Sequence, residues 1–511
     1  TTVRDPRFSG DGAWIEWSVA RPLRTSYERA KGTDYAVVRV PVAGGAVDTL
    51  AGPVERRFSP VWSEDGSAFA YGDRGDVYVR YADGDSVVNL TEGQRPQVSE
   101  DDTTKVSFSV ERWRPDGGAV LLGSKKGYYT LDPRSGDLTL VLELQGDEDT
   151  RPRLDVQGWS QDGRYLFLST SARDHWERGL VRYDLQARRM DDLVKNSDVY
   201  ADWHVSDDGA RVVYRGSDGD HPDDLYAADT DFDDVRRLTT LNPQLQGVAL
   251  AHSELVDYLD VDGKRLYGVL YYPYGYQEGR KYPLVAEIYE TFFDNGYNEN
   301  VNILAAQGWF VFRPSVNLVV GRPGEAWIKG VTTGINSLIE RGLVDEKRLG
   351  VEGQSYGGYA VNLLVTQTDR FAAAVNVSGK VDIISFLGDS EKITTRNYSA
   401  AEEGQDRIGA TLWEAPLKYI DHSAVMFADR ITTPLLLLSG EGDWNVPATN
   451  EREMYYALRR LGKEVVWVNY IRGGHGAGRA STVEDFHDHW RRMADWFREH
   501  FEKVDADVEG G

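Results

Sequence analysis

A serine set between closely spaced glycines constrains the fold of this chain more than any other feature. Residues 353–357 read Gly-Gln-Ser-Tyr-Gly, after a short apolar run at 349–351 and before a helix-compatible stretch at 359–365. Strand, sharp turn and helix in this order are the setting of a nucleophile elbow. The glycines are needed because side chains at these positions would clash with the neighbouring strand and helix. We therefore predict a strand–turn–helix unit that presents Ser355 as a nucleophile.

A serine hydroxyl is a poor nucleophile at neutral pH, so it needs a base and a group that orients the base. The apolar run at 434–439 leads into Asp443, and a second run at 465–470 leads into His475. Side chains that follow the strands of a parallel sheet collect at its carboxyl edge. We predict His475 as the base and Asp443 as the orienting acid, although Asp443 alone would also fit an ordinary turn after a strand.

Four other histidines follow the serine and compete with His475 for the role of base. His487, His489 and His500 lie in a C-terminal segment whose bulky apolar residues recur at helical spacing. We interpret them as solvated helix residues. His422 lies in a polar stretch before a helix-like segment, and we interpret it as a capping or surface residue.

The negative charge that develops on an attacked carbonyl oxygen requires hydrogen-bond donors. The backbone N–H of Tyr356, the residue after the nucleophile, is the first. An apolar run at 284–288 reads as a strand and is followed by Tyr289, whose hydroxyl is able to supply the second. A buried aromatic at the end of a strand is the alternative for Tyr289.

Residues 267–503 resemble the catalytic domain of the prolyl oligopeptidase family of serine peptidases. The matching segments are 344–350, 353–359, 440–447 and 474–476. The resemblance implies an α/β-hydrolase domain, no cofactor or metal, and cleavage of peptides through an acyl-enzyme.

By the same resemblance, Ser355 is the nucleophile, Asp443 the acid and His475 the base. Tyr289 stands where dipeptidyl peptidases carry a tyrosine that completes the oxyanion hole. The chain departs from many members at 289–293, which read Tyr-Glu-Thr-Phe-Phe where those members have a Gly-Gly-Pro type of sequence. The carboxylate of Glu290 either shapes substrate choice or pairs with a nearby base.

The substrate pocket is only loosely defined by the sequence. In relatives, the segment corresponding to 378–383 helps to wall the pocket for the residue before the cut bond. Lys380 in this segment either binds an acidic substrate side chain or points to solvent. The candidates for the pocket are Glu290, Tyr359, Lys380, Ile383, Trp444 and Val446.

The first half of the chain contains an internal repeat. Asp-Gly pairs recur with their aspartates 54, 51, 46 and 46 residues apart, and strand-like runs follow most of them. The repeated aspartates are Asp11, Asp65, Asp116, Asp162 and Asp208. A period of roughly 40–50 residues with hairpin turns is typical of the blades of a β-propeller, and the Asp-Gly pairs supply the positive φ that such turns require.

Five blades are visible, whereas the resemblance implies seven or eight. We therefore expect an incomplete all-β propeller at 1–250, truncated, processed or lacking about two N-terminal blades, followed by an α/β-hydrolase domain at 251–511. A genuine five-bladed propeller is the alternative. Association with a missing N-terminal fragment and formation of a homo-oligomer both remain open.

The composition limits the partners and the chemistry. The net charge of −24 argues against nucleic-acid and anionic-membrane partners. No apolar run approaches the ~20 residues of a membrane span, so we expect a soluble protein, with a cytoplasmic or periplasmic location of bacterial type left undecided. The absence of cysteine excludes disulfides and thiol catalysis.

The sequence thus favours a serine peptidase acting on short or unfolded peptides, because the resemblance implies a propeller that restricts access to the site. An esterase or acyl hydrolase using the same three residues, and a propeller scaffold without catalysis, are the alternatives. No clear pair of propeller glutamates that would capture a substrate amino terminus stands out, so exopeptidase and endopeptidase action are both open.

Overall fold

The computed structural model describes residues 2–22, 33–54, 60–81, 87–98, 104–206, 208–218, 221–389 and 396–509. The chain forms two compact units, which we call the propeller unit (Thr1–Ser217 with Asp223–Leu241) and the α/β unit (Asp218–Pro222 with Asn242–Gly511). The domain bounds of 1–250 and 251–511 stay a prediction from the sequence. Within the described ranges, no helix is both long enough and apolar enough to cross a membrane.

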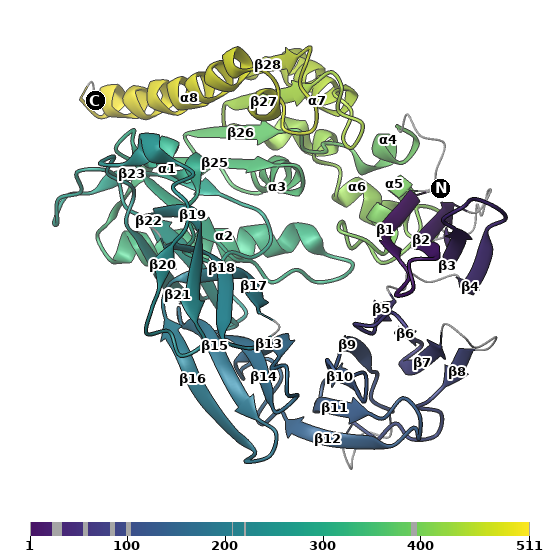
Figure 1. Ribbon diagram of the computed structural model, residues 1–511. Helices are drawn as coiled ribbons and strands as arrows, with labels where there is room; N and C mark the ends of the chain where they lie inside the picture. The colour runs from purple at the N-terminus through teal and green to yellow at the C-terminus, as the bar shows by residue number, and fades with distance from the viewer. Residues whose placement is uncertain are drawn as a thin grey trace. The chain divides into compact units, whose positions relative to one another are not determined.

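The propeller unit consists of antiparallel sheets of four strands each (Figure 1). The described residues form five such sheets, one for each predicted blade. Their strands are β1 (Thr2–Phe8), β2 (Trp14–Pro22), β3 (Thr33–Pro41) and β4 (Asp48–Val54); β5 (Val61–Trp62), β6 (Ala68–Asp73), β7 (Asp76–Tyr81) and β8 (Val87–Asn89); β9 (Ser109–Trp113), β10 (Val120–Ser124), β11 (Gly127–Leu131) and β12 (Leu138–Glu143); β13 (Arg153–Trp159), β14 (Tyr165–Ser171), β15 (Arg178–Asp184) and β16 (Arg189–Asn196); and β17 (Val199–Val205), β18 (Arg211–Asp218), β19 (His221–Asp229) and β20 (Arg236–Arg237).

The predicted Asp-Gly turns are confirmed, and each has the same geometry. The glycine takes a positive φ and donates its N–H to the carbonyl oxygen three residues earlier, while the aspartate accepts the backbone N–H two residues further on. The glycines and their φ values are Gly12 (68°), Gly66 (69°), Gly117 (70°), Gly163 (69°) and Gly209 (67°). The repeat in the sequence is therefore a repeat of one turn that joins the first two strands of each blade.

Hydrophobic clusters join each sheet to the next one along the chain. The shared clusters pair Val37 with Phe69, Val79 with Val120, Leu121 with Leu166, and Phe167 with Trp203. Successive four-stranded sheets that pack face to face are the architecture of a β-propeller. That this propeller includes further blades stays a prediction from the sequence.

The α/β unit is built on one sheet of eight strands, in the order β21-β22-β24-β23-β25-β26-β27-β28. The strands from β24 to β28 pair in parallel, and β21 and β22 add an antiparallel edge. The strands are β21 (Ser253–Leu259), β22 (Arg265–Tyr271), β23 (Tyr282–Glu287), β24 (Phe310–Pro314), β25 (Val344–Gln354), β26 (Ala373–Val377), β27 (Leu435–Gly440) and β28 (Val465–Tyr470). Strands β26 and β27 are buried along their whole length, as expected for central strands covered on both faces.

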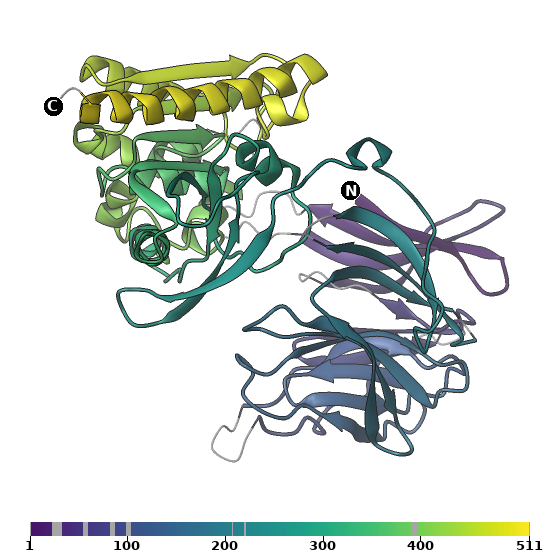
Figure 2. The ribbon, with the colours of Figure 1, turned by 90° about the vertical axis from the view of Figure 1, so that its left-hand side faces the viewer.

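Helices cover both faces of this sheet. Along β25, Leu349 and Val351 pack in one cluster with α2 and α3, whereas Gly350 between them faces Phe497 of α8, because successive residues of a strand point to opposite faces. Figure 2 shows α8 running along one side of the unit. The helices are α1 (Glu299–Ala305), α2 (Pro323–Glu340), α3 (Tyr356–Leu364), α4 (Ile383–Gly388), α5 (Arg396–Glu402), α6 (Pro416–Asp421), α7 (Thr449–Arg460) and α8 (Val483–Glu509).

Candidate active site

Ser355 lies in the turn between β25 and α3, as predicted, in a backbone conformation that a non-glycine residue rarely adopts. Its φ is 59° and its ψ is −115°, a strained combination that persists only where the surroundings enforce it. The surroundings are very tight. A Cβ atom on Gly353 would lie 2.4 Å from the carbonyl carbon of Gly357, and a Cβ on Gly357 would lie 2.2 Å from the carbonyl oxygen of Ile288. The two glycines are therefore required by close packing.

The structure brings Ser355, His475 and Asp443 together. Nε2 of His475 lies 2.8 Å from Oγ of Ser355, and Nδ1 lies 2.8 Å from Oδ2 of Asp443. The other carboxylate oxygen, Oδ1, accepts the backbone N–H groups of Asn445 (2.8 Å) and Val446 (3.0 Å). The buried carboxylate thus accepts the Nδ1 hydrogen, which leaves Nε2 as the acceptor for the serine hydroxyl.

Parallel strands explain why residues so far apart in the sequence meet. Strands β25, β27 and β28 end at Gln354, Gly440 and Tyr470, and the carboxyl ends of parallel strands share one edge of the sheet. The loop that carries His475 comes very close to the loop that carries Asp443, since a Cβ on Gly440 would lie 2.3 Å from the carbonyl oxygen of Gly474.

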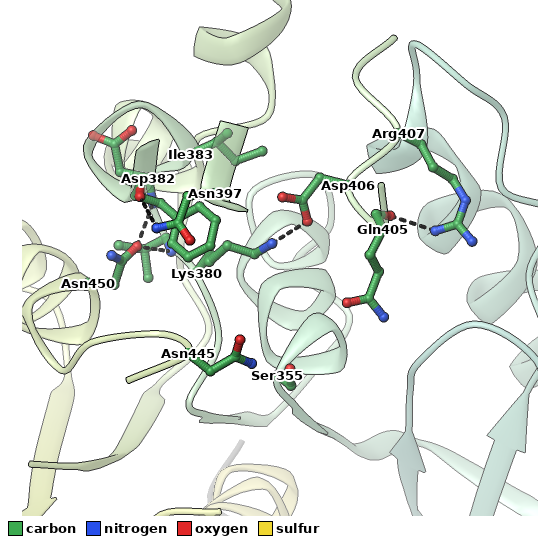
Figure 3. A network of polar contacts seen from close by, with 12 residues as sticks. Ser355, Lys380, Asp382, Ile383, Asn397, Gln405, Asp406, Arg407, Asn445 and Asn450 are labelled. Atoms are coloured by element: carbon green, nitrogen blue, oxygen red, sulfur yellow. Dashed lines mark hydrogen bonds and ion pairs between the residues drawn. The ribbon is translucent and has the colours of Figure 1, made fainter. Parts of the chain in front are cut away.

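Asn445 is a site residue that sequence reasoning missed. Its Nδ2 lies 2.9 Å from Nε2 of His475, and Arg396 donates to its Oδ1. Figure 3 shows Asn445 next to Ser355. Its place two residues after Asp443, inside the motif at 440–447, was the available signal.

The histidine loop is also held by Arg479, which the sequence did not reveal. Its Nη1 donates to Oε1 of Gln354 (3.1 Å), and Gln354 in turn donates to the carbonyl oxygen of His475 (3.1 Å). Nη2 of Arg479 lies 3.3 Å from Oε2 of Glu352. Arg479 therefore links the strand before the nucleophile to the loop that carries the base.

Glu352 is buried, and its pKa is raised from its ordinary value of 4.5 to about 7, chiefly by burial. This value includes the opposing effects of Arg479 and Arg313, which lower the pKa, and of Glu287, which raises it. A carboxyl group whose pKa is raised on folding stabilises the folded state below its unfolded pKa, and this contribution is lost as the pH rises through the folded pKa. The stabilising contribution of Glu352 is therefore lost between about pH 4.5 and pH 7.

This window gives a prediction for the Glu352→Gln variant. Between pH 5 and pH 8, the free energy of unfolding of the wild type should fall by roughly 2–3 kcal/mol relative to that of the variant. Urea unfolding of both proteins at the two pH values measures the difference. Glu346→Gln, an exposed position on the same strand, is the control and should follow the wild type. If the difference in the free energy of unfolding between the wild type and Glu352→Gln did not change with pH, the assignment of the raised pKa to Glu352 would be contradicted.

The two predicted oxyanion donors lie next to the elbow. Tyr356 is the first residue of α3, so its N–H has no partner within the helix. Tyr289 follows β23, and its ring packs edge-to-face on Tyr356 with the ring centres 6.1 Å apart. The indole N–H of Trp327 donates to the carbonyl oxygen of Tyr289 (2.7 Å) and fixes its backbone.

The candidate pocket residues differ in exposure. Tyr359, Ile383 and Val446 are buried, and Trp444 is 50% exposed. Arg407 pairs with Glu290 at 2.9 Å, which agrees with the alternative in which this carboxylate pairs with a nearby base. The roles of the candidate pocket residues in binding substrate stay predictions.

Lys380 does not point to solvent, so that alternative is wrong. Its side chain is buried and forms an ion pair with Asp406, which is also buried (Figure 3). Its Nζ lies 4.7 Å from the centre of the Phe386 ring. Because Asp406 already compensates the charge of Lys380, the pair does not favour binding of an acidic substrate side chain. Asp406 lies 26 residues further along the chain, in a stretch without a motif that would have indicated it.

Two histidines of α8 are placed differently from the prediction. His489 and His500 are buried, with exposed fractions of 0% and 4%, because the face of α8 that carries them packs inward. Burial, together with the nearby charge of Arg479, lowers the pKa of His489 to about 3. His422 is a capping residue, as predicted, but it caps the C-terminal end of the preceding helix, α6. It is buried rather than on the surface.

The fold and these contacts define a class of protein. An eight-stranded, mostly parallel sheet that presents a serine on an elbow, an aspartate after a later strand and a histidine after the last strand is an α/β-hydrolase domain. Residues 318–504 match the model of the prolyl oligopeptidase family, so this part of the chain is similar to members of that family. The matched stretch contains Ser355, Asp443 and His475.

The chain is similar to several known peptidases. The uncharacterized peptidase YuxL of Bacillus subtilis is 25% identical over 390 residues, which cover 72% of this chain and 56% of that protein. Dipeptidyl-peptidase 5 of Porphyromonas gingivalis is 22% identical over 452 residues, which cover 78% of this chain and 61% of that protein. The chain thus spans little more than half the length of these relatives.

Solved structures support the two-part fold. A puromycin-hydrolyzing peptidase of Mycobacterium tuberculosis has a TM-score of 0.74 and 19% identity, and the match covers 98% of this chain and 79% of that one. The acylaminoacyl peptidase of Pyrococcus horikoshii has a TM-score of 0.69 and 19% identity, with 98% and 82% covered. The fold is therefore an N-terminal β-propeller followed by an α/β-hydrolase domain.

Proposed function

We propose that this protein is a serine peptidase that cleaves peptide bonds through an acyl-enzyme on Ser355. The observation that carries the proposal is the pair of hydrogen bonds made by His475, 2.8 Å to Ser355 and 2.8 Å to Asp443. These are the contacts that a nucleophile, a base and an orienting acid need. The peptidases among its relatives support peptides as the first substrate class to test.

The chemistry follows from the geometry. Nε2 of His475 takes the hydroxyl proton of Ser355 while Oγ attacks the substrate carbonyl carbon, and Asp443 stabilises the imidazolium that forms. The Tyr356 N–H and the Tyr289 hydroxyl donate to the oxyanion. The imidazolium then protonates the leaving amine as the C–N bond breaks. Water, activated by His475 in the same way, hydrolyses the acyl-enzyme.

The proposal extends to the substrates only through the resemblance to the family. A restriction to short or unfolded peptides is what that resemblance implies, and the choice between exopeptidase and endopeptidase action is left to experiment. Association with further propeller blades or with a second copy of the chain stays a prediction.

A digest of a mixed peptide library, read by mass spectrometry, tests the proposal. The wild type should release peptide fragments, and Ser355→Ala should release no detectable fragments over the same time. The residue before each new terminus gives the preference of the pocket. Hydrolysis of p-nitrophenyl esters by a wild-type protein that cleaves no library peptide would instead establish the esterase alternative.

A further inference from the structure

Two residues of the segment after α5, Gln405 and Arg407, contact the region of the proposed oxyanion hole. Nε2 of Gln405 lies 2.8 Å from the hydroxyl oxygen of Tyr289 and 3.0 Å from Oε1 of Glu290. Arg407 holds the same carboxylate, with Nη2 2.9 Å from Oε2 and Nη1 3.4 Å from Oε1. In Figure 3 the amide of Gln405 points away from the Lys380–Asp406 pair.

The carboxylate of Glu290 fixes the orientation of the Gln405 amide. An amide nitrogen only donates, an amide oxygen only accepts, and an ionised carboxylate only accepts. If the amide turned over, its oxygen would face the carboxylate, and the two acceptors would repel each other. The nitrogen therefore faces Glu290, and it faces Tyr289 at the same time.

The orientation of the amide decides the direction of the hydrogen bond to Tyr289. Because Gln405 is the donor, the hydroxyl oxygen of Tyr289 is the acceptor, and the single hydroxyl hydrogen remains free to donate elsewhere. A hydroxyl that accepts one hydrogen bond also becomes a better donor of another. Without Gln405, the carboxylate of Glu290 is the competing acceptor for this hydrogen.

We infer that Gln405, held by Glu290 and Arg407, is a positioning residue that keeps the Tyr289 hydroxyl ready to donate to the oxyanion. This inference rests on the proposed function. It assigns to Glu290 and Arg407 the task of orienting an amide, and it explains why a carboxylate next to the hole does not capture the hydrogen of Tyr289.

Two variants of Gln405 separate this role from a structural one. Gln405→Leu removes the donor, and the rate of acylation by p-nitrophenyl butyrate should fall about tenfold. Gln405→Glu has the same shape, but its carboxylate accepts the Tyr289 hydrogen, so the rate should fall further than in Gln405→Leu. A purely structural role would lower the rate by the same factor whether or not residue 289 carries a hydroxyl.

A double-mutant cycle with Tyr289→Phe tests whether Gln405 acts through Tyr289. Tyr289→Phe alone should lower the rate about 10²-fold, as expected for the loss of one oxyanion donor. In the Tyr289→Phe background, Gln405→Leu should change the rate less than twofold. Glu403→Gln, an exposed position on the same segment, is the control and should leave the rate unchanged.

The outcomes distinguish the inference from the function on which it rests. Equal effects of Gln405→Leu in the two backgrounds, or a Gln405→Glu variant as fast as the wild type, would overturn the inference alone. A folded wild type that reacts neither with the ester nor with a fluorophosphonate would overturn the proposed function and the inference with it. Thermal unfolding of every variant confirms that it is folded.

Discussion

Replacing Ser355 by alanine is expected to lower kcat by about 10⁶-fold, and replacing His475 by alanine should cost about the same. The double variant should lose no more activity than either single variant. The reason is that the two residues act as one unit. Nε2 of His475 lies 2.8 Å from Oγ of Ser355 and accepts its proton, and neither residue has a catalytic task without the other. Hydrolysis of p-nitrophenyl butyrate, followed with all three variants, measures the effect.

The residual activity is informative as well. The oxyanion donors remain in these variants, so the activity should stay above the uncatalysed rate. His487→Ala, an exposed residue of α8, is the control and should keep the activity of the wild type. Losses that multiply in the double variant would show that the two residues act independently, against the account given above.

Asp443→Asn is expected to lower kcat by about 10⁴-fold with little change in KM. The backbone N–H groups of Asn445 and Val446 bind Oδ1 of Asp443 at 2.8 and 3.0 Å. In the variant they should retain the carbonyl oxygen of the new side chain, which turns its NH2 group toward Nδ1 of His475. The imidazole then carries its hydrogen on Nε2 and cannot accept the proton of Ser355.

Asp421→Asn, an exposed position at the end of α6, makes the same chemical change away from the site. It should keep the kcat of the wild type. If Asp443→Asn lost less than tenfold in kcat, Asp443 would not be orienting the base.

The elements that the sequence predicted well carry local signals. The glycines around Ser355, the buried run before Asp443 and the glycines around His475 are each required by contacts close by in the chain. Each motif lies at the end of a strand or a few residues after it. The Asp-Gly turns of the propeller repeat for the same reason. A positive φ and a hydrogen bond across three residues require particular residues at particular positions.

The residues that the sequence did not reveal act over long separations. Gln405 contacts Tyr289 across 116 residues, and Arg479 contacts Glu352 across 127. Each lies in a stretch without a motif, and its role depends on which segments the sheet brings together. The pairing of Lys380 with Asp406 was missed for the same reason.

The error on α8 has a different cause. His489 and His500 are spaced so that they share a face of the helix with Met493 and Trp496. The periodicity of the segment therefore already placed them on the apolar face. Polar side chains suggest exposure to solvent, but the position of the two histidines on the helix decides their burial.

The central claim is that Ser355 is the nucleophile, and mass spectrometry of the protein after reaction with a fluorophosphonate tests it most directly. We expect one adduct per chain, located on Ser355 by peptide mapping and absent from a folded Ser355→Ala variant. A folded wild type that stays unmodified, or that carries its adduct on another residue, would contradict the claim.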